Sequence, residues 1–297
     1  MSSRRYTLGH LAALGTVLIW GTTFVSTKVL LQDFMPVTVL FSRFVIGYAI
    51  LWCLKPQFLP LSGWRKEFLF AGAGLTGVTL YFLLENIALT YTSATNVGIL
   101  VAIVPFFTAL LAHFLLKGER LTSRFLAGLA VAFTGIFLIM VNGALVLQLN
   151  PVGDMMALGA AFVWAVYSIL MKKIGVNTAN MVLYTRRIFF YGIMLMLPAL
   201  FLLPVNVDWT LFAKPVNAAN FLYLGLCASA LCFLAWSRVV DVLGAVKSSV
   251  YIYMVPVINV VAASLILGER LTWISLAGIS LTLCGVVMSE YKKRTVR

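Results

Sequence analysis

The chain has 297 residues, of which 62% are hydrophobic and only 10% are charged. A soluble globular domain carries about a quarter of its residues as charged side chains, so this composition excludes a water-soluble fold. The net charge of +13 would suit a nucleic-acid binder in a soluble protein, but here the cations stand between apolar runs. We therefore expect an integral membrane protein that binds no nucleic acid.

Ten segments of the chain are apolar enough to cross a bilayer, whose hydrocarbon core of about 30 Å needs roughly 20 apolar residues per helix. The expected spans are 8–28, 36–54, 67–90, 94–116, 123–141, 153–173, 180–203, 217–240, 245–267 and 273–290. Because only short polar breaks separate them, the sequence predicts an all-α polytopic membrane protein with no separate soluble domain.

The positions of the cations predict the orientation of the chain. With a cytoplasmic N-terminus, the cations on the inner side are Arg4, Arg5, Lys55, Arg65, Lys66, Lys117, Arg120, Arg124, Lys172, Lys173, Arg238, Lys247, Lys292, Lys293, Arg294 and Arg297. The outer side holds only Lys28, Lys214 and Arg270. This bias predicts a multi-pass protein of the inner (plasma) membrane with both termini in the cytoplasm.

The sequence contains an internal repeat. The segment Gly118–Thr122 reappears as Gly268–Thr272, and each copy follows a span that contains a Val-Pro pair. Residues 1–143 and 144–297 would then each hold five spans. Because five is odd, the second copy must enter the membrane upside down relative to the first. Inverted repeats of this kind underlie alternating access in transporters, with the site between the two halves.

Several short motifs resemble those of the drug/metabolite transporter superfamily, EamA type. They are the Trp20–Phe24 segment followed by Lys28, the turn at Tyr91–Ala94, and the Gly-Glu-Arg-Leu pattern in both halves. The resemblance covers essentially the whole chain. It implies ten helices, a central cavity between the halves and the movement of small metabolites, often amino acids and commonly outward. The second half departs from the pattern at Val242–Ala245, where the Tyr-Thr-Ser turn is lost.

Two opposite charges are expected at similar depth in the first half, where a charge within a span is costly. Arg43 and Glu85 each lie about 10 Å from the outer end of their spans, at 1.5 Å of helix per residue. We expect both to face one water-accessible region and to form a pair. The alternative is that Arg43 snorkels or binds backbone carbonyls while Glu85 borders outer water. If protons drive transport, Glu85 is the expected carrier.

Arg186 is the repeat partner of Arg43, but the position equivalent to Glu85 holds Trp236. The second half thus has a cation without an equivalent acid. Arg186 would either pair with Asp241 or attract an anionic group of the substrate. Arg187 is expected to be a snorkelling anchor on the inner side.

Aromatic residues and prolines complete the candidate site. Trp20 and Trp164 fall near the middle of repeat-related spans, where they either pack in the core or line a cavity. The further candidate lining residues are Tyr81, Trp236 and Tyr251. Pro105 and Pro256 fall in mid-span, where each removes a backbone hydrogen bond. They predict kinks or gates beside the binding site.

Small residues indicate packing rather than chemistry. Gly128 and Gly135 recur as Gly278 and Gly285, and fit either internal packing or a homodimer face. The cysteines lie in apolar stretches without metal-ligand spacing, so we expect neither a metal site nor a disulfide. They are Cys53, Cys227, Cys232 and Cys284.

The sequence thus favours a secondary transporter that exports small metabolites such as amino acids, without a cofactor, with a small-molecule substrate and the lipid bilayer as its partners. Two alternatives stay open. A carrier of phosphorylated or nucleotide-linked metabolites would need several cations at the cavity. A membrane-embedded enzyme would need a nucleophile or metal cluster at depth, for which the two histidines offer little support.

The orientation is testable by cysteine labelling in a variant without the four native cysteines. Ser3→Cys and Thr295→Cys should react with a membrane-impermeant maleimide only in permeabilised cells, because both positions are expected inside. Asn206→Cys, in an expected outer loop, should react in intact cells. Labelling of Ser3→Cys and Thr295→Cys from opposite sides would disprove the even number of crossings.

Overall fold

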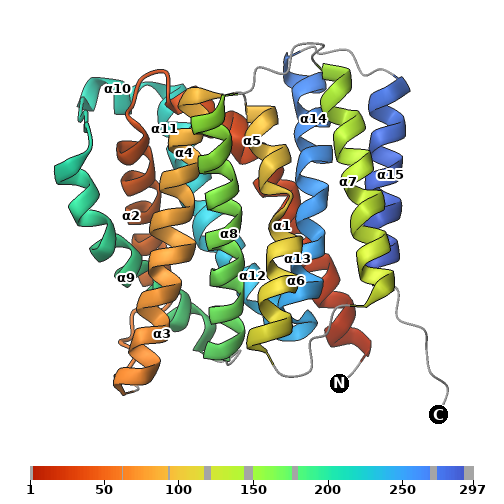
Figure 1. Cartoon of the computed structure of the whole chain (residues 1–297). Helices are drawn as coiled ribbons and strands as arrows, with labels where there is room; N and C mark the ends of the chain where they lie inside the picture. The colour runs from red at the N-terminus through yellow and green to blue at the C-terminus, as the bar shows by residue number, and fades with distance from the viewer. Residues whose placement is uncertain are drawn as a thin grey trace.

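The computed structural model describes residues 3–61, 63–92, 94–116, 122–143, 150–175, 180–267 and 273–290. Within these ranges the chain forms helices and no strand, which confirms the all-α class (Figure 1). Both Gly-Glu-Arg-Leu-Thr turns lie outside the described residues except for Thr122. The Thr122 hydroxyl accepts a hydrogen bond from the Phe125 backbone N–H at 3.1 Å, so it caps the helix that follows.

The helices follow one another along the whole chain. In the first half they are α1 (Ser3–Leu30), α2 (Pro36–Leu54), α3 (Trp64–Gly74), η1 (Leu75–Leu80), α4 (Tyr81–Tyr91), α5 (Ala94–Val101), α6 (Val104–Leu115) and α7 (Ser123–Gly143). In the second half they are α8 (Pro151–Ile174), α9 (Met181–Leu202), α10 (Trp209–Ala213), α11 (Pro215–Leu222), η3 (Tyr223–Leu231), α12 (Cys232–Leu243), α13 (Ala245–Val250), η4 (Tyr251–Tyr253), α14 (Met254–Leu267) and α15 (Trp273–Glu290).

The helical segments are long and apolar enough for a membrane protein. Among the described residues, seven continuous helices reach the length and hydropathy needed to cross a bilayer, and two shorter apolar helices cover Ser123–Leu138 and Leu276–Ser289. Many side chains on the outer surface are apolar, such as Phe201 and Leu11. The chain is therefore a multi-pass integral membrane protein.

Four of the helical segments contain irregular turns, and these occur at matching places in the two halves. The segment from α3 to α4 winds through the π-helix η1, and the segment from α11 to α12 winds through the π-helix η3. The helix break at Ala102–Ile103 separates α5 from α6, and the 3₁₀ turn η4 separates α13 from α14. The continuous spans expected at 94–116 and 245–267 are thus interrupted, because Pro105 and Pro256 cannot donate to the preceding turn.

The helices α7 and α15 lie side by side, and their glycines face each other (Figure 1). A Cβ atom built on Gly285 would come within 2.6 Å of the Gly128 carbonyl oxygen, and one built on Gly135 within 2.5 Å of the Gly278 carbonyl oxygen. The early residue of each helix therefore meets the late residue of the other, so the pair is antiparallel. Of the two expectations for these glycines, internal packing is the one observed, and homodimerisation stays a prediction.

The connection between α1 and α2 is tied to the connection between α9 and α11. Asp33 accepts hydrogen bonds from the Asn217 side chain at 2.7 Å and from Lys214 Nζ at 3.1 Å. These two donors hold the pKa of Asp33 below its ordinary value. Asn206 adds a hydrogen bond from its side chain to the Asp33 carbonyl oxygen. Loops from both halves of the chain are thereby held together at the end of the bundle where α1 ends.

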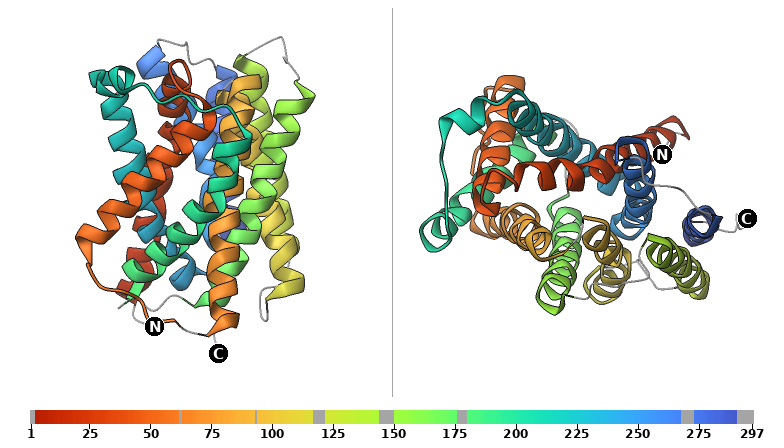
Figure 2. Two further views of the ribbon diagram at one scale, coloured as in Figure 1. Left: turned by 90° about the vertical axis from the view of Figure 1, so that its left-hand side faces the viewer. Right: turned by 90° about the horizontal axis from the view of Figure 1, so that it is seen from above.

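The helical body begins and ends on one side. In Figure 1, α1 starts and α15 finishes at the same end of the bundle, and the view from above in Figure 2 shows α7 and α15 as a pair beside the main group of helices. All four cysteines are free.

The glycine contact between α7 and α15 makes a sharp stability prediction. Gly285→Ala places a methyl group within 2.4 Å of the Ala132 backbone nitrogen, so the helices must separate, at a cost of about 1–3 kcal/mol. Gly15→Ala is the matched control, because a Cβ there meets no atom within 4 Å. We expect thermal unfolding in detergent to shift to lower temperature for Gly285→Ala alone. Equal unfolding temperatures for Gly285→Ala and Gly15→Ala would contradict the close helix contact.

Candidate functional site

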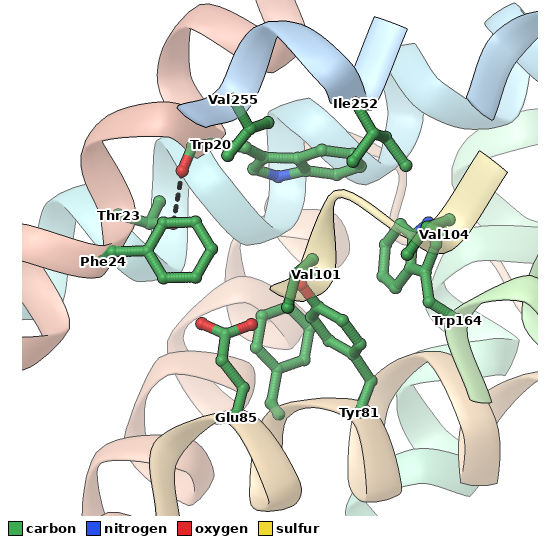
Figure 3. A pocket seen from close by; sticks show the side chains of 11 residues that line it. Trp20, Thr23, Phe24, Tyr81, Glu85, Val101, Val104, Trp164, Ile252 and Val255 are labelled. Atoms are coloured by element: carbon green, nitrogen blue, oxygen red, sulfur yellow. Dashed lines mark hydrogen bonds between the residues drawn. The ribbon is translucent and has the colours of Figure 1, made fainter. Parts of the chain in front are cut away.

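The structure contains a small cavity at the place where the two halves of the chain meet. Its lining residues are Trp20, Thr23, Phe24, Tyr81, Phe82, Glu85, Val101, Val104, Trp164, Ile252 and Val255. Figure 3 shows these side chains converging from α1, α4, the α5–α6 break, α8, η4 and the start of α14. Four of the eight candidates for substrate binding line this cavity: Trp20, Tyr81, Glu85 and Trp164.

Glu85 is the one charged residue in this lining. It is 1% exposed, and its carboxylate points into the cavity toward Phe24 (Figure 3). Tyr81 lies one helical turn earlier on α4, and its hydroxyl faces the same space (Figure 3). A carboxylate among apolar walls attracts cations, ammonium groups or protons, because no water shields its charge.

Three tryptophans form a cluster across the cavity wall. The ring centroids of Trp20 and Trp164 are 5.2 Å apart, and those of Trp20 and Trp236 are 4.9 Å apart. The Trp20 indole N–H donates to the Ala228 carbonyl oxygen at 3.1 Å, which connects α1 to η3. Trp20 and Trp164 therefore both pack in the core and line the cavity, so the two expectations for them were not exclusive.

Trp236 and Tyr251 stand behind the lining rather than in it. Trp236 is fully buried and reaches the cavity only through Trp20. The Tyr251 hydroxyl is hydrogen-bonded to His10 Nδ1, and the next residue, Ile252, takes the place expected for Tyr251 in the wall. The shift of one position follows from the tight winding of η4.

The two helix breaks border the cavity. Val101 and Val104 flank the break between α5 and α6, and Ile252 and Val255 lie at the corresponding place in the second half. Pro105 is the second residue of α6 and lies in its first turn, where the backbone N–H groups have no partner within the helix. Irregular backbone at membrane depth is tolerated where it lines a cavity, as both breaks do here.

The cavity is nearly closed. Its free volume of about 30 Å³ has room for only a few water molecules and for no metabolite. The site would have to widen before it could take a substrate.

The expected ion pair between Arg43 and Glu85 is absent. Arg43 is 1% exposed, and its Nε donates to the Ser229 hydroxyl of η3 at 3.1 Å. Its guanidinium carbon lies 4.2 Å from the centroid of the Phe82 ring. The prediction was wrong because it used depth alone, while the π-helices and the packing of Phe82 decide where each side chain points.

Arg186 does not reach the central cavity either. It donates to the carbonyl oxygens of Lys55 and Gln57 in the connection between α2 and α3, and its guanidinium carbon lies 3.7 Å from the Trp52 ring centroid. A second cavity lies beside it. Asp241, its expected partner, binds Arg5 at 3.1 Å and Arg238 at 3.6 Å instead.

Arg187 also has a structural role instead of snorkelling. Its Nη1 lies 3.3 Å from a Glu67 carboxylate oxygen, which also accepts a hydrogen bond from the Tyr191 hydroxyl. Arg186 therefore fastens the segment that precedes α3, and Arg187 holds both α3, through Glu67, and that segment, through the Leu59 carbonyl oxygen.

Sequence analysis missed several lining residues. Thr23 and Phe24 belong to the Trp20–Phe24 motif but were not singled out, and Phe82 stands beside the predicted Tyr81. Val101 and Ile252 lie four residues before the two prolines, so the proline signal could have found them. Within the described residues no cluster of potential metal ligands occurs.

Comparisons with known proteins agree with this architecture. The sequence model of the EamA-like transporter family matches twice, over residues 7–141 and 151–291. A transporter of Archaeoglobus fulgidus, described as uncharacterized, is 29% identical over 96% of this chain and 98% of its own length. A solved crystal structure has the same fold, with a TM-score of 0.74 at 19% identity over 95% of this chain and 97% of its own.

Two further relatives carry substrate names. A "probable terminal-alkyne amino-acid exporter" of Streptantibioticus cattleyicolor is 30% identical over 92% of this chain and 90% of its own length. A "probable amino-acid metabolite efflux pump" of Escherichia coli is 28% identical over 95% of this chain and 94% of its own. The family match covers nearly all of both halves, so the chain belongs to the EamA-like transporter family.

Proposed function

We propose that this protein is a secondary transporter that exports small metabolites such as amino acids through the central cavity. The observation that carries the proposal is a single buried carboxylate, Glu85, among aromatic rings contributed by both halves of the chain. A polar group at such depth is costly, so a membrane protein retains it where it serves a pathway or a ligand.

Inverted repeats in a ten-helix arrangement, residues 1–143 and 144–297, explain how the site would alternate. Several observations support them: the double family match, the antiparallel pairing of α7 with α15, and the matching π-helices and breaks. Two copies of one unit in opposite orientations have two nearly equivalent packings, each open to one side. The helix breaks at the cavity are places where the backbone can bend without losing further hydrogen bonds.

The cavity lining favours an amphipathic substrate over a phosphorylated one. Its walls are aromatic and aliphatic, and its one charge is negative. A phosphorylated metabolite would bring negative charge toward Glu85, with no cation in the described lining to offset it. The names of the two exporter relatives point to amino acids as well.

An enzyme finds less support. Among the lining residues the only ionisable groups are Glu85 and Tyr81, and neither stands beside a nucleophile or a metal-ligand cluster in the described part of the chain. We also propose location in the inner (plasma) membrane with both termini in the cytoplasm, because most cations then lie on the inner side.

Counterflow in proteoliposomes tests the function directly. Vesicles loaded with one unlabelled compound are given the labelled compound outside, over a panel of amino acids, nucleosides and phosphorylated sugars, with and without a pH gradient. We expect exchange for amino acids and none for phosphorylated sugars. Exchange for no member of the panel would overturn the proposal.

Glu85→Gln removes the one charge of the lining while keeping its shape. We expect its counterflow rate to fall by about tenfold or more, the loss that follows when a buried hydrogen bond to a charged group is removed. The matched control is Asp208→Asn, which removes a carboxylate outside the cavity and keeps a side chain that can cap α10. Equal rates for Glu85→Gln and wild type would contradict the role of Glu85.

A further inference from the structure

Arg43 is a buried cation whose hydrogen-bonding groups are largely unused. The side chain is 1% exposed, and only its Nε has a partner, the Ser229 hydroxyl. Both terminal nitrogens, Nη1 and Nη2, are buried without any hydrogen-bond partner. A buried donor without a partner costs free energy, so these two nitrogens would gain from a group that can accept their hydrogen bonds.

The guanidinium lies directly behind the wall of the central cavity. Its carbon is 4.2 Å from the centroid of the Phe82 ring, and Phe82 is itself a lining residue. The cation–π contact partly offsets the burial of the charge. Phe82 therefore both contacts Arg43 and borders the cavity, and a change of its rotamer would bring the unpaired nitrogens to the cavity surface.

The opposite charge stands on the same helix. Glu85 follows Phe82 by three residues on α4, so the two share a helix face, and its carboxylate points into the cavity (Figure 3). Its negative charge attracts the Arg43 guanidinium across the wall. No ion pair forms between them, so each keeps its charge available for a ligand.

The sum of these charges selects a class of ligand. Arg43 and Glu85 together are neutral, and no other charged residue lines the cavity. In a low-dielectric interior a ligand with net charge leaves that charge uncompensated, whereas a zwitterion adds none. A zwitterion also offers one group of each sign, which matches the one acid and the one cation at the site.

On the basis of the proposed function, we propose that the cavity binds zwitterionic α-amino acids with apolar or aromatic side chains. The ammonium group binds Glu85, and the carboxylate accepts two hydrogen bonds from Nη1 and Nη2 of Arg43 once Phe82 has moved aside. The apolar side chain packs against Trp20 and Trp164. The present cavity is too small for this ligand, so binding and widening occur together.

This arrangement couples recognition to movement. A ligand shifts a conformational equilibrium only by its difference in affinity for the two states. The closed state offers the carboxylate of a substrate nothing, because Phe82 covers Arg43. The open state offers it a charge-assisted pair of hydrogen bonds, so the substrate carboxylate itself stabilises the widened cavity.

The test compares three ligands that differ by one charged group each. Phenylalanine, phenethylamine and 3-phenylpropionate are added as competitors to counterflow of labelled phenylalanine. If the panel shows that another amino acid exchanges instead, that amino acid and its decarboxylated and deaminated analogues take their place. For the wild type we expect each analogue to compete about tenfold more weakly or worse, since each loses a charged contact. Equal competition by all three ligands would overturn the proposal without any variant.

Two variants should then weaken competition by different ligands. Arg43→Gln should weaken competition by phenylalanine but not by phenethylamine, and Glu85→Gln should weaken competition by phenylalanine but not by 3-phenylpropionate. Arg65→Gln, the same change at an exposed arginine, is the control and should leave all three unchanged. A parallel loss for all three ligands in Arg43→Gln would show a merely structural role and would sink the inference.

The possible failures are distinguishable. If Arg43→Gln does not fold, as judged by size-exclusion chromatography, Arg43→Lys replaces it. This variant keeps the charge but loses the paired donors, so competition by phenylalanine relative to phenethylamine should weaken in part. If amino acids exchange but the analogues compete as strongly as the amino acids themselves, the transport function stands and the zwitterion site is wrong. If nothing exchanges, the proposed function itself fails.

Discussion

The cost of a charge away from water governs this structure. Each cation that reaches into the helical body must find a partner, and most find backbone carbonyls or carboxylates. Lys28 donates to the Leu89 and Thr92 carbonyl oxygens at the end of α4, Arg186 to the loop before α3, and Arg187 to Glu67. These side chains are satisfied and hold the fold together. Arg43 is the exception, because its Nε binds the Ser229 hydroxyl while its guanidinium lies against the Phe82 and Phe44 rings with Nη1 and Nη2 unpaired. The candidate site therefore lies beside the cation whose donors lack partners, whereas the cations with partners hold the fold together.

The two halves resemble each other in framework but not in chemistry. Irregular turns occur at matching places in the two halves, and the glycines of α7 and α15 meet in the reciprocal way expected of equivalent helices. Yet Arg43 faces the cavity wall while its counterpart Arg186 fastens a loop, and the position equivalent to Glu85 holds the buried Trp236. With different side chains on similar backbones, the first half carries the polar groups and most of the apolar wall, and the second half adds Trp164, Ile252 and Val255. Such asymmetry suits a cavity that binds a single, unsymmetrical ligand.

Membership of the EamA-like family accounts for the fold and the general activity, and the cavity lining restricts the range of expected substrates. A likeness near 30% identity carries the architecture, but the specificity of a transporter depends on a few side chains at the binding site. Here these are one acid, one covered guanidinium and a set of aromatic rings. The near absence of free space in the cavity indicates a closed packing, in which aromatic contacts replace the substrate. Opening must break contacts such as those of Trp20 with Trp164 and Trp236, and a bound ligand would offset that loss.

The sequence by itself determined the membrane class, the approximate helix positions and the family, because each depends on composition, spacing or motifs that tertiary contacts do not alter. It also pointed to Glu85, Tyr81, Trp20 and Trp164, since polar and aromatic residues in mid-span are rare enough to stand out. Only the tertiary structure decided which way these side chains face. The π-helix η1 shifts the later residues of α4 around the helix axis, so depth alone paired Arg43 with Glu85 wrongly, and the 3₁₀ turn η4 puts Ile252 where Tyr251 was expected. Local winding and the packing of Phe82 set these directions, and no linear pattern records them.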